Sequence, residues 1–220
     1  MTTTLKIDFV SDISCPWCAI GLAALEQALA QSSDVLSAEL HFQPCELNPQ
    51  MPPGGQDITE HLTQKYGSTP EQQAQIRATI AQRGQDVGFS FNAAGRGRIY
   101  RTFDAHRLLH WAGLETGVKQ AALKKALLVS CHSKSQNVES HAVLLDAAAR
   151  AGLDRARAQQ ILESDEFAAE VREREAFYTG HGINSVPAVI INERHLISGG
   201  QPVAMFEQAL RQIAAEQVEA

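Results

Sequence analysis

The segment Cys15-Pro16-Trp17-Cys18 constrains this chain most, because it places two cysteines three residues apart at the expected start of a helix. A short alternating segment, Leu5 to Val10, precedes it, and an amphipathic run that fades near Gln31 follows it. Cysteines at positions i and i+3 of a first helical turn bring their sulfurs close enough to bridge. The free N–H groups and the positive end of the helix dipole stabilise a thiolate there. The spacing therefore predicts a reversible disulfide.

The two thiols are expected to differ in exposure and acidity. Cys18 shares a helix face with the apolar positions between Leu22 and Leu29, so it points inward, whereas Cys15 stays at the lip of the helix. A thiol in this setting can have its pKa lowered from about 8.5 to roughly 3.5–7.5, which would leave Cys15 substantially ionised at neutral pH. Pro16 suits the first helical position, where a missing N–H costs nothing. We therefore predict that Cys15 attacks and Cys18 resolves.

C-x-x-C is also the spacing of zinc ligands. A structural zinc site needs two further ligands, usually from a second close pair of Cys or His. The remaining cysteines, Cys45 and Cys131, stand alone and far apart in the sequence. Because strand, C-x-x-C and helix follow one another in the order typical of redox proteins, we favour the redox interpretation and expect no metal.

Composition narrows the class of protein and its partners. At 220 residues the chain can form one large domain or a small domain with an insertion. A net charge of −6 without a basic cluster argues against nucleic acid as a partner. Residues 1–6 lack the features of a secretion signal, and no segment is apolar enough to span a membrane. Four cysteines in a chain of this length do not form a disulfide scaffold, which suits a reducing compartment. Together these features predict a soluble cytoplasmic protein without a membrane partner. They do not define an oligomeric state.

Two strand patterns flank the predicted C-x-x-C helix. Apolar and polar residues alternate in segment 5–10, which ends at Ser11-Asp12, and again in segment 38–44. A strand, a helix and a strand in this order form a β-α-β unit with parallel strands and a right-handed crossover.

The pattern changes at Cys45, where a turn-rich connector over residues 46–55 begins. From about Ile58 to His181 the pattern is almost entirely helical. Capping boxes at Asp57 and Thr69 mark two helix starts. Glycines mark the expected helix ends at Gly88, Gly113, Gly152 and Gly182.

Strand patterns return near the C-terminus. Residues 188–192 form a continuous apolar run typical of a buried strand, residues 195–198 follow as its antiparallel partner, and a last helix begins after Pro202. The predicted order is β-α-β, helical insertion, β-β-α. We expect a discontinuous sheet domain of residues 1–47 and 182–220 and a helical insertion domain of residues 48–181.

Several motifs point to a known family. They are Ser11 to Cys18 with Ile20-Gly21, Phe42-Gln43-Pro44 before Glu46-Leu47-Asn48-Pro49, Asp104 to Leu108 with His110-Trp111-Ala112, and Gly182-Ile183 with Val186-Pro187 and Ile197 to Pro202. With the predicted element order, they resemble the DsbA-like family of α/β proteins with a thioredoxin-like fold. Within it they resemble the cytoplasmic FrnE-type branch, labelled polyketide biosynthesis dithiol-disulfide isomerase. The resemblance spans nearly the whole chain.

The resemblance implies a thiol-disulfide oxidoreductase or isomerase with a Cys-Pro-Trp-Cys redox site, in which Pro16 and Trp17 are motif residues. Trp17 would shape the substrate surface or cover the disulfide. By resemblance, Pro187 follows a cis peptide bond beside the C-x-x-C, and the backbone of Val186 binds an extended substrate; from the residues alone, a trans turn proline stays open. The partner implied is a disulfide-containing protein or a small thiol, with glutathione as an optional co-substrate and no other cofactor.

Two other functions stay open. Glutathione-dependent kappa-class transferases and 2-hydroxychromene-2-carboxylate isomerases share the fold and bind glutathione in the same cleft, but they generally lack the paired cysteine, so Cys18 argues against them. A non-enzymatic peptide-binding, holdase-like module would use the groove beside Pro187 and would keep its clients without cysteines. Ala19, Cys45 and Arg101 depart from the residues usual in the branch, which leaves the substrate preference open.

The remaining candidates have plainer interpretations. Asp12 could tune proton transfer during exchange, or cap the turn before the helix. His106 and His110 have the i, i+4 spacing of metal ligands, but without a third ligand a packing or hydrogen-bonding role is favoured. Cys45 could be a third redox thiol, because it leaves the second predicted strand near the insertion. A small buried hydrophobic residue is the favoured interpretation for Cys45 and also for Cys131.

Overall fold

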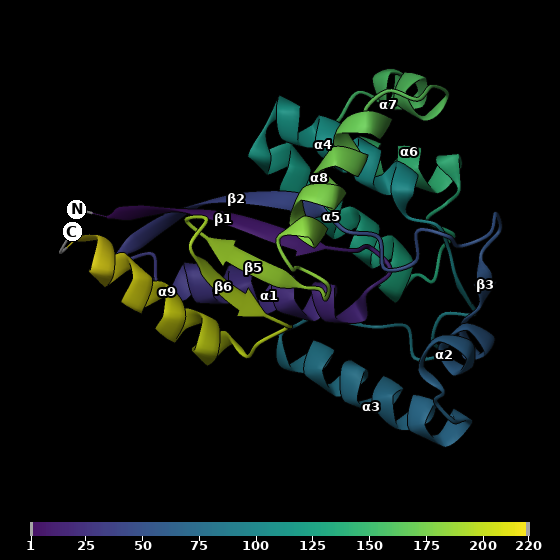
Figure 1. Cartoon of the computed structure of the whole chain (residues 1–220), viewed down its shortest axis with the longest axis horizontal. Helices are drawn as coiled ribbons and strands as arrows, with labels where there is room; N and C mark the ends of the chain where they lie inside the picture. The colour runs from purple at the N-terminus through teal and green to yellow at the C-terminus, as the bar shows by residue number, and fades with distance from the viewer. Residues whose placement is uncertain (1, 219–220) are drawn as a thin grey trace.

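Four strands form the central sheet in the order β2-β1-β5-β6 (Figure 1). The computed structural model describes residues 2–218. β1 (Thr3–Ser11) lies parallel to β2 (Leu36–Pro44) and antiparallel to β5 (Ala188–Ile191), which pairs with β6 (His195–Ser198). The predicted β-α-β unit and the predicted C-terminal hairpin therefore join into one sheet, although more than 140 residues separate β2 from β5 in the sequence.

Alternation along β1 builds the main core. Leu5, Ile7 and Phe9 are fully buried and face α1 (Pro16–Gln31) and α9 (Val203–Val218), which pack against each other on this side of the sheet. The predicted last helix buries Phe206, Leu210 and Ile213 on the face that packs against this core. Burying such side chains contributes about 1.5–3 kcal/mol each, so this layer anchors the start of α1.

The chain between β2 and β5 forms most of the helices. They are α2 (Ile58–Tyr66), α3 (Pro70–Asp86), α4 (Phe103–Glu115), α5 (Gly117–Leu128), α6 (His141–Arg150), α7 (Arg155–Leu162) and α8 (Ala168–Gly180), with a π-helical turn η1 (Val129–Ser133). α4, α5 and α8 contact β2, and α3 contacts α1 (Figure 1). The helices after β2 thus surround the end of the sheet at which α1 begins.

This region differs from the predicted all-helical pattern in one detail. Two-residue strands β3 (Gln56–Asp57) and β4 (Arg98–Ile99) pair in antiparallel fashion. The Arg98 side chain fixes the pairing, because its guanidinium donates to the carbonyls of Gly54 and Gly55 at 3.0 and 2.8 Å. A side chain reaching back across 43 residues leaves no periodic signal in the sequence.

Most of the predicted helix boundaries are confirmed. Thr69 and Gln72 form a reciprocal capping box, whereas Asp57 caps α2 by accepting from the N–H groups of residues 59 and 60. The expected stop at Gly113 is wrong, because α4 continues to Glu115. A Cβ atom at Gly113 would lie 2.7 Å from Nε2 of Gln120, so this glycine serves helix packing and not helix termination.

Within residues 2–218, no helix combines the length and the apolar composition needed to cross a membrane.

Candidate active site

The C-x-x-C motif occupies the first turn of α1, as its spacing predicts. Cys15 is the N-cap residue, with an extended backbone (φ −86°, ψ 115°), and Pro16 takes the first helical position. The N–H of Cys18 donates to the Cys15 carbonyl at 3.1 Å and closes the turn. No side chain caps α1, and the N–H groups of Trp17 and Cys18 lie close enough to the Cys15 sulfur to favour its thiolate.

Both thiols are free and buried, with 4% of Cys15 and 0% of Cys18 exposed. Cys15 is thus less exposed than its predicted place at the helix lip suggests. Its Sγ lies 3.7 Å from the Val186 carbonyl oxygen, and Val186 and Trp17 pack on the same apolar cluster. The Cys15 sulfur is therefore covered in part by the backbone of Val186.

The two thiols differ in acidity. A hydrogen bond from the Cys18 thiol lowers the pKa of Cys15 and outweighs the opposing effect of burial, and the N–H groups of Cys18 and Trp17 add to the lowering. Burial raises the pKa of Cys18 well above its ordinary value, and the hydrogen bond to Cys15 raises it further. The hydrogen bond between the two thiols therefore favours the thiolate at Cys15 and disfavours it at Cys18.

The loop before β5 packs directly against α1. The Val186–Pro187 peptide bond is cis. A Cβ atom on Gly21 would lie 3.0 Å from Cγ of Pro187 and 3.2 Å from Cα of Gly200, and one on Gly200 would lie 3.0 Å from the Trp17 carbonyl oxygen. The two glycines therefore allow helix and loop backbones to approach closely, which brings the Val186 carbonyl to Cys15.

Asp12 lies beneath the motif and is 1% exposed. Its carboxylate accepts from the Ser14 N–H at 3.1 Å and hydroxyl at 2.7 Å, and from the Leu47 N–H at 2.8 Å, while Nε2 of His106 lies 3.6 Å away. Burial opposes its ionisation, but His106 and these donors outweigh burial and hold the Asp12 pKa well below its usual value. The negative charge in turn opposes ionisation of Cys15. Asp12 thus caps the turn and also acts on the thiol electrostatically.

Cys45 lies in the segment that follows β2 and is partly buried. Burial raises the pKa of its thiol to about 12, and the charges of Asp12 and Glu175 add to the effect. Arg172 of α8 donates to the neighbouring Glu46 at 2.5 Å, and the next residue, Leu47, donates its N–H to Asp12. At neutral pH, Cys45 is therefore protonated, and its pKa is shifted in the opposite direction to that of Cys15.

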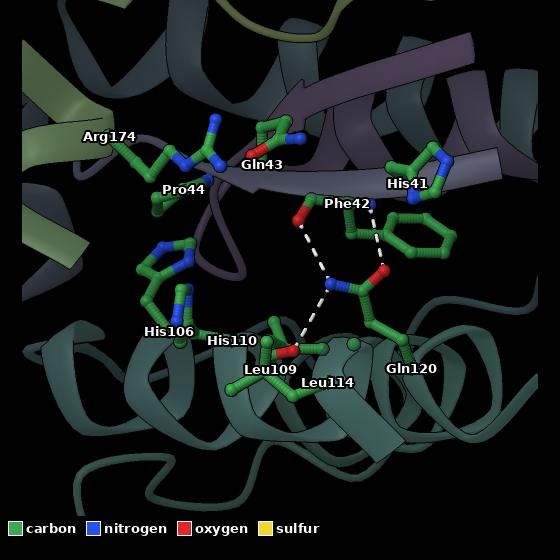
Figure 2. A pocket seen from close by; sticks show the side chains of 11 residues that line it. His41, Phe42, Gln43, Pro44, His106, Leu109, His110, Leu114, Gln120 and Arg174 are labelled. Atoms are coloured by element: carbon green, nitrogen blue, oxygen red, sulfur yellow. Dashed lines mark hydrogen bonds between the residues drawn. The ribbon is translucent and has the colours of Figure 1, made fainter. Parts of the chain in front are cut away.

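A cavity lies between the end of β2 and α4 (Figure 2), and its volume is about 130 Å³. His106 and His110 lie on its α4 side and Arg174 on its α8 side. A second cavity, of about 710 Å³, extends over the outer face of the sheet beneath α8. Neither of these two cavities is lined by Cys15 or Cys18.

The two histidines of α4 have separate surroundings. His106 faces Asp12, whereas the His110 ring packs on Phe167 with a centroid distance of 5.3 Å, and burial lowers the His110 pKa. Across the described residues, no cluster of three or more His, Cys, Asp or Glu side chains has the proximity to hold a metal ion.

Sequence reasoning missed two buried groups near the thiols. Lys124 of α5 is 0% exposed, and its ammonium nitrogen has no hydrogen-bond partner in the described structure. His132 of η1 is 2% exposed, donates to the Ile13 carbonyl at 2.9 Å, and has a pKa that burial and Arg96 lower well below its ordinary value. A lysine in a helix is normally expected to be exposed to solvent. The sequence alone therefore does not indicate that Lys124 is buried.

The sheet order and the helix that starts at Cys15 define a thioredoxin-like protein. More particularly, the chain belongs to the family of DSBA-like thioredoxin domains, whose family model matches residues 6–211. A crystal structure described as a probable DsbA oxidoreductase from Streptomyces coelicolor is 31% identical, with a TM-score of 0.85 over 94% of this chain and 89% of that chain. The chain therefore belongs with DsbA-like oxidoreductases.

Two further solved structures resemble the fold alone, because their identities are low. A 2-hydroxychromene-2-carboxylate isomerase is 12% identical, with a TM-score of 0.72 over 97% of this chain and 98% of that chain. The cytosolic disulfide reductase DsbM from Pseudomonas aeruginosa, solved with GSH, is 17% identical, with a TM-score of 0.62 over 94% and 99%. No curated protein matches the chain in sequence.

Proposed function

We propose that this protein catalyses thiol-disulfide exchange on disulfide-containing proteins or small thiol compounds, with Cys15 as the attacking and Cys18 as the resolving thiol. The observation that carries the proposal is the opposite direction of the two pKa shifts on one helical turn, lowered at Cys15 and raised at Cys18. The thiolate is the nucleophile in such exchange, so the thiol with the lowered pKa is the one that attacks.

The reaction proceeds in two displacements. The Cys15 thiolate attacks a substrate disulfide, forms a mixed disulfide and releases one substrate thiolate. Cys18 then attacks the Cys15 sulfur, which forms the Cys15–Cys18 bridge and releases the second substrate thiolate. The Val186 carbonyl, 3.7 Å from the Cys15 sulfur, is well placed to pair with an extended substrate next to the cis-Pro187 bond, and Trp17 borders the same surface.

We further propose a FrnE-type, cytoplasmic role in which the protein works as a reductase or isomerase, with glutathione as the co-substrate that regenerates its dithiol. In a cytosol near about −250 mV, a couple as oxidising as about −120 mV would favour the dithiol by roughly 10⁴-fold, at about 30 mV per decade. Net oxidation of substrates is therefore unfavourable there. Acid trapping of the protein in cells should find Cys15 and Cys18 mainly reduced, and a mainly bridged protein would contradict this direction.

A second candidate is a glutathione-dependent isomerase, favoured by the fold that the chain shares with 2-hydroxychromene-2-carboxylate isomerase. In that function Cys18 has no role. The Cys18→Ser variant would then keep full activity, which separates the two candidates.

The experiment that tests the main proposal is reduction of a peptide disulfide by glutathione, with variants of each cysteine. We expect Cys15→Ser to lose catalysed exchange and Cys18→Ser to accumulate a mixed disulfide detectable by mass spectrometry. Cys131→Ser, which removes a buried thiol of a separate apolar cluster and keeps both motif cysteines, is the matched control and should retain activity. Equal alkylation rates of the remaining motif thiol in the two variants would contradict the assignment of roles.

A further inference from the structure

Lys124 is the most unusual ionisable group in the described structure that the exchange mechanism does not yet use. Its side chain is fully buried, and its Nζ atom lacks any hydrogen-bond partner among the described residues. Taking an ammonium group out of water without a partner is unfavourable, and this cost shifts buried lysines toward the neutral amine. Burial accordingly lowers the Lys124 pKa, although the nearby thiols and Asp12 oppose the lowering.

The packing of α5 directs this amine toward the underside of the thiol site. One turn before Lys124, Gln120 binds the backbone N–H and carbonyl of Phe42 on β2 at 3.0 and 3.1 Å (Figure 2). One turn after it, Leu128 belongs to the same apolar cluster as Cys15 and Cys18. Residues four apart share a helix face, so Lys124 lies on the face that joins β2 to the C-x-x-C cluster.

The charged and titratable neighbours of Lys124 come from several elements. Within electrostatic range lie Asp12 before α1, Cys15 and Cys18 on α1, Cys45 after β2 and His132 on η1. His106 of α4 joins this group through its contact with Asp12.

Among them, Cys18 is the group that needs a base. It is 0% exposed, and its thiol must lose a proton before it can resolve a mixed disulfide. Burial raises the Cys18 pKa well above the ordinary value, so water alone would deprotonate it slowly.

The other polar groups are weaker bases than an amine. The Asp12 carboxylate is occupied by the Ser14 and Leu47 donors and by His106, which keep its proton affinity low. His132 already uses its Nε2 in the bond to the Ile13 carbonyl, and burial keeps its affinity for a second proton low as well.

We propose that the neutral amine of Lys124 accepts the Cys18 proton during resolution, an inference that rests on the exchange function proposed above. The proton passes from the Cys18 sulfur to Nζ, and the Cys18 thiolate attacks the Cys15 sulfur. The Cys15–Cys18 bond forms as the bond from Cys15 to the substrate sulfur breaks. The substrate leaves as a thiolate and takes its proton from the Lys124 ammonium or from water, so no further oxidant or reductant is consumed.

No hydrogen bond joins Lys124 to Cys18 in the dithiol structure. The proton therefore moves through one bridging water, or after rotation of the lysine side chain, as is general for bases within one water of their donor. In this arrangement α5, a helix between β2 and β5 in the sequence, supplies a group to the chemistry of α1.

The test compares Lys124→Met with Lys124→Arg. Methionine keeps the volume without a base, and arginine keeps a positive charge but cannot deprotonate. In single-turnover reaction of the reduced protein with a small disulfide, we expect both variants to resolve the mixed disulfide on the order of 10²–10⁴-fold more slowly at pH 7. Their rates should rise tenfold per pH unit as hydroxide replaces the base, whereas alkylation of Cys15 stays within threefold of the unmodified protein.

Wild-type resolution rates in either variant would overturn the proposal. Rescue by arginine alone would also overturn it, because that result requires a charge and not a base. If neither variant folds, the unmodified protein still provides a test. Its resolution rate should level off below pH 10.4, about the ordinary lysine pKa, and a continued tenfold rise per unit beyond that pH would refute the role.

The exchange function and the role of Lys124 fail in different ways. If the unmodified protein never forms the Cys15–Cys18 bridge, the exchange function itself is wrong. If the bridge forms at a rate that is independent of Lys124, only the role of Lys124 is wrong.

Discussion

The first turn of α1 and the face of α5 that packs behind it both affect the reactivity of Cys15 and Cys18, but they do so in different ways. The first turn works through local geometry, because Cys15, Pro16 and Cys18 are adjacent in sequence and the N–H groups come from the same helix. The α5 face works across more than 100 residues, through a fully buried Lys124 that lies within electrostatic range of both cysteines. Only the first of these regions could be recognised from a motif.

The difference shows where each kind of information resides. A C-x-x-C motif at a helix start fixes which atoms can react and roughly how acidic one of them is. The buried charges that move protons around it depend on which helix packs behind the sheet, and that depends on contacts such as Gln120 with Phe42. Four substitutions test this contrast, beginning with the one of largest expected effect.

Gly21→Val should have the largest effect, because it disturbs the packing of α1 against the loop before β5. Its side chain would clash with Pro187 and Gly200, which lie 3.0 and 3.2 Å from the position of a Cβ atom. Overpacking of this kind costs about 1–3 kcal/mol in unfolding free energy, and a displaced Val186 carbonyl should slow exchange roughly 100-fold. Chemical denaturation and a disulfide reduction assay measure both effects. Gly180→Ala, with open space around the added Cβ, is the control, and equal behaviour of the two variants would contradict the close approach of helix and loop.

Asp12→Asn should separate the capping role of Asp12 from its charge. Asparagine keeps one acceptor oxygen for the Leu47 or Ser14 donors but removes the charge that opposes ionisation of Cys15. The pH midpoint of Cys15 alkylation should therefore fall. Alkylation of the reduced protein followed by mass spectrometry measures this midpoint, and an unchanged or higher value would refute the electrostatic role.

The same variant should change stability in acid by about 2 kcal/mol in unfolding free energy. The folded pKa of Asp12 is lowered, so its stabilising contribution is fully present above about pH 4, the unfolded value, and is lost as the pH falls toward the folded value. Below about pH 4 the wild type should therefore lose stability more steeply than Asp12→Asn. Parallel acid unfolding curves would contradict the lowered pKa.

Gly113→Ala should weaken the packing of α5 against β2 and leave the first turn of α1 intact. The added Cβ would displace the Gln120 amide, which binds Phe42 and the Leu109 carbonyl. Losing these buried hydrogen bonds should cost about 1–2 kcal/mol in unfolding free energy. Cys15 alkylation should stay unchanged while resolution by Cys18 slows, since Lys124 lies on the turn of α5 that follows Gln120. A parallel loss of both thiol activities would show that the two regions are not separable.

His132→Gln should have the smallest effect, confined to a pH range. The folded pKa of His132 is lowered, so below about pH 6.5 the unfolded chain binds a proton that the folded protein does not. Wild-type stability should therefore fall with pH below about 6.5, by at most about 1.4 kcal/mol per pH unit from this group, and the variant should lack that component. Glutamine can still donate to the Ile13 carbonyl. His181→Gln is an exposed control for the loss of an imidazole, and identical slopes in all three proteins would contradict the account.

Much of the architecture follows from the sequence, because alternation and capping are local properties. The segments 5–10 and 38–44 predict β1 and β2, and the Thr69 capping box predicts the start of α3. Gly113 misled the prediction of α4, since a glycine required for the approach of Gln120 looks the same as one that ends a helix.

The features of the candidate site also divide into those that the sequence predicts and those that only the fold reveals. Cys15, Cys18 and the Val186–Pro187 loop could be predicted from motifs, but the degree of burial of Cys15 and the buried Lys124 could not. Both depend on tertiary contacts, from the loop before β5 in one case and from α5 in the other. Burial by a distant segment leaves no periodic or motif signal in the residues that become buried.

The most direct test of the central claim is equilibration of the purified protein in graded glutathione buffers, with the thiol state of Cys15 and Cys18 followed by mass spectrometry after alkylation. We predict one two-electron transition between a dithiol and a Cys15–Cys18 bridge, in the range of about −120 to −270 mV. If no bridge forms at any ratio and glutathione binds without a covalent bond, the thiol-disulfide exchange account is wrong.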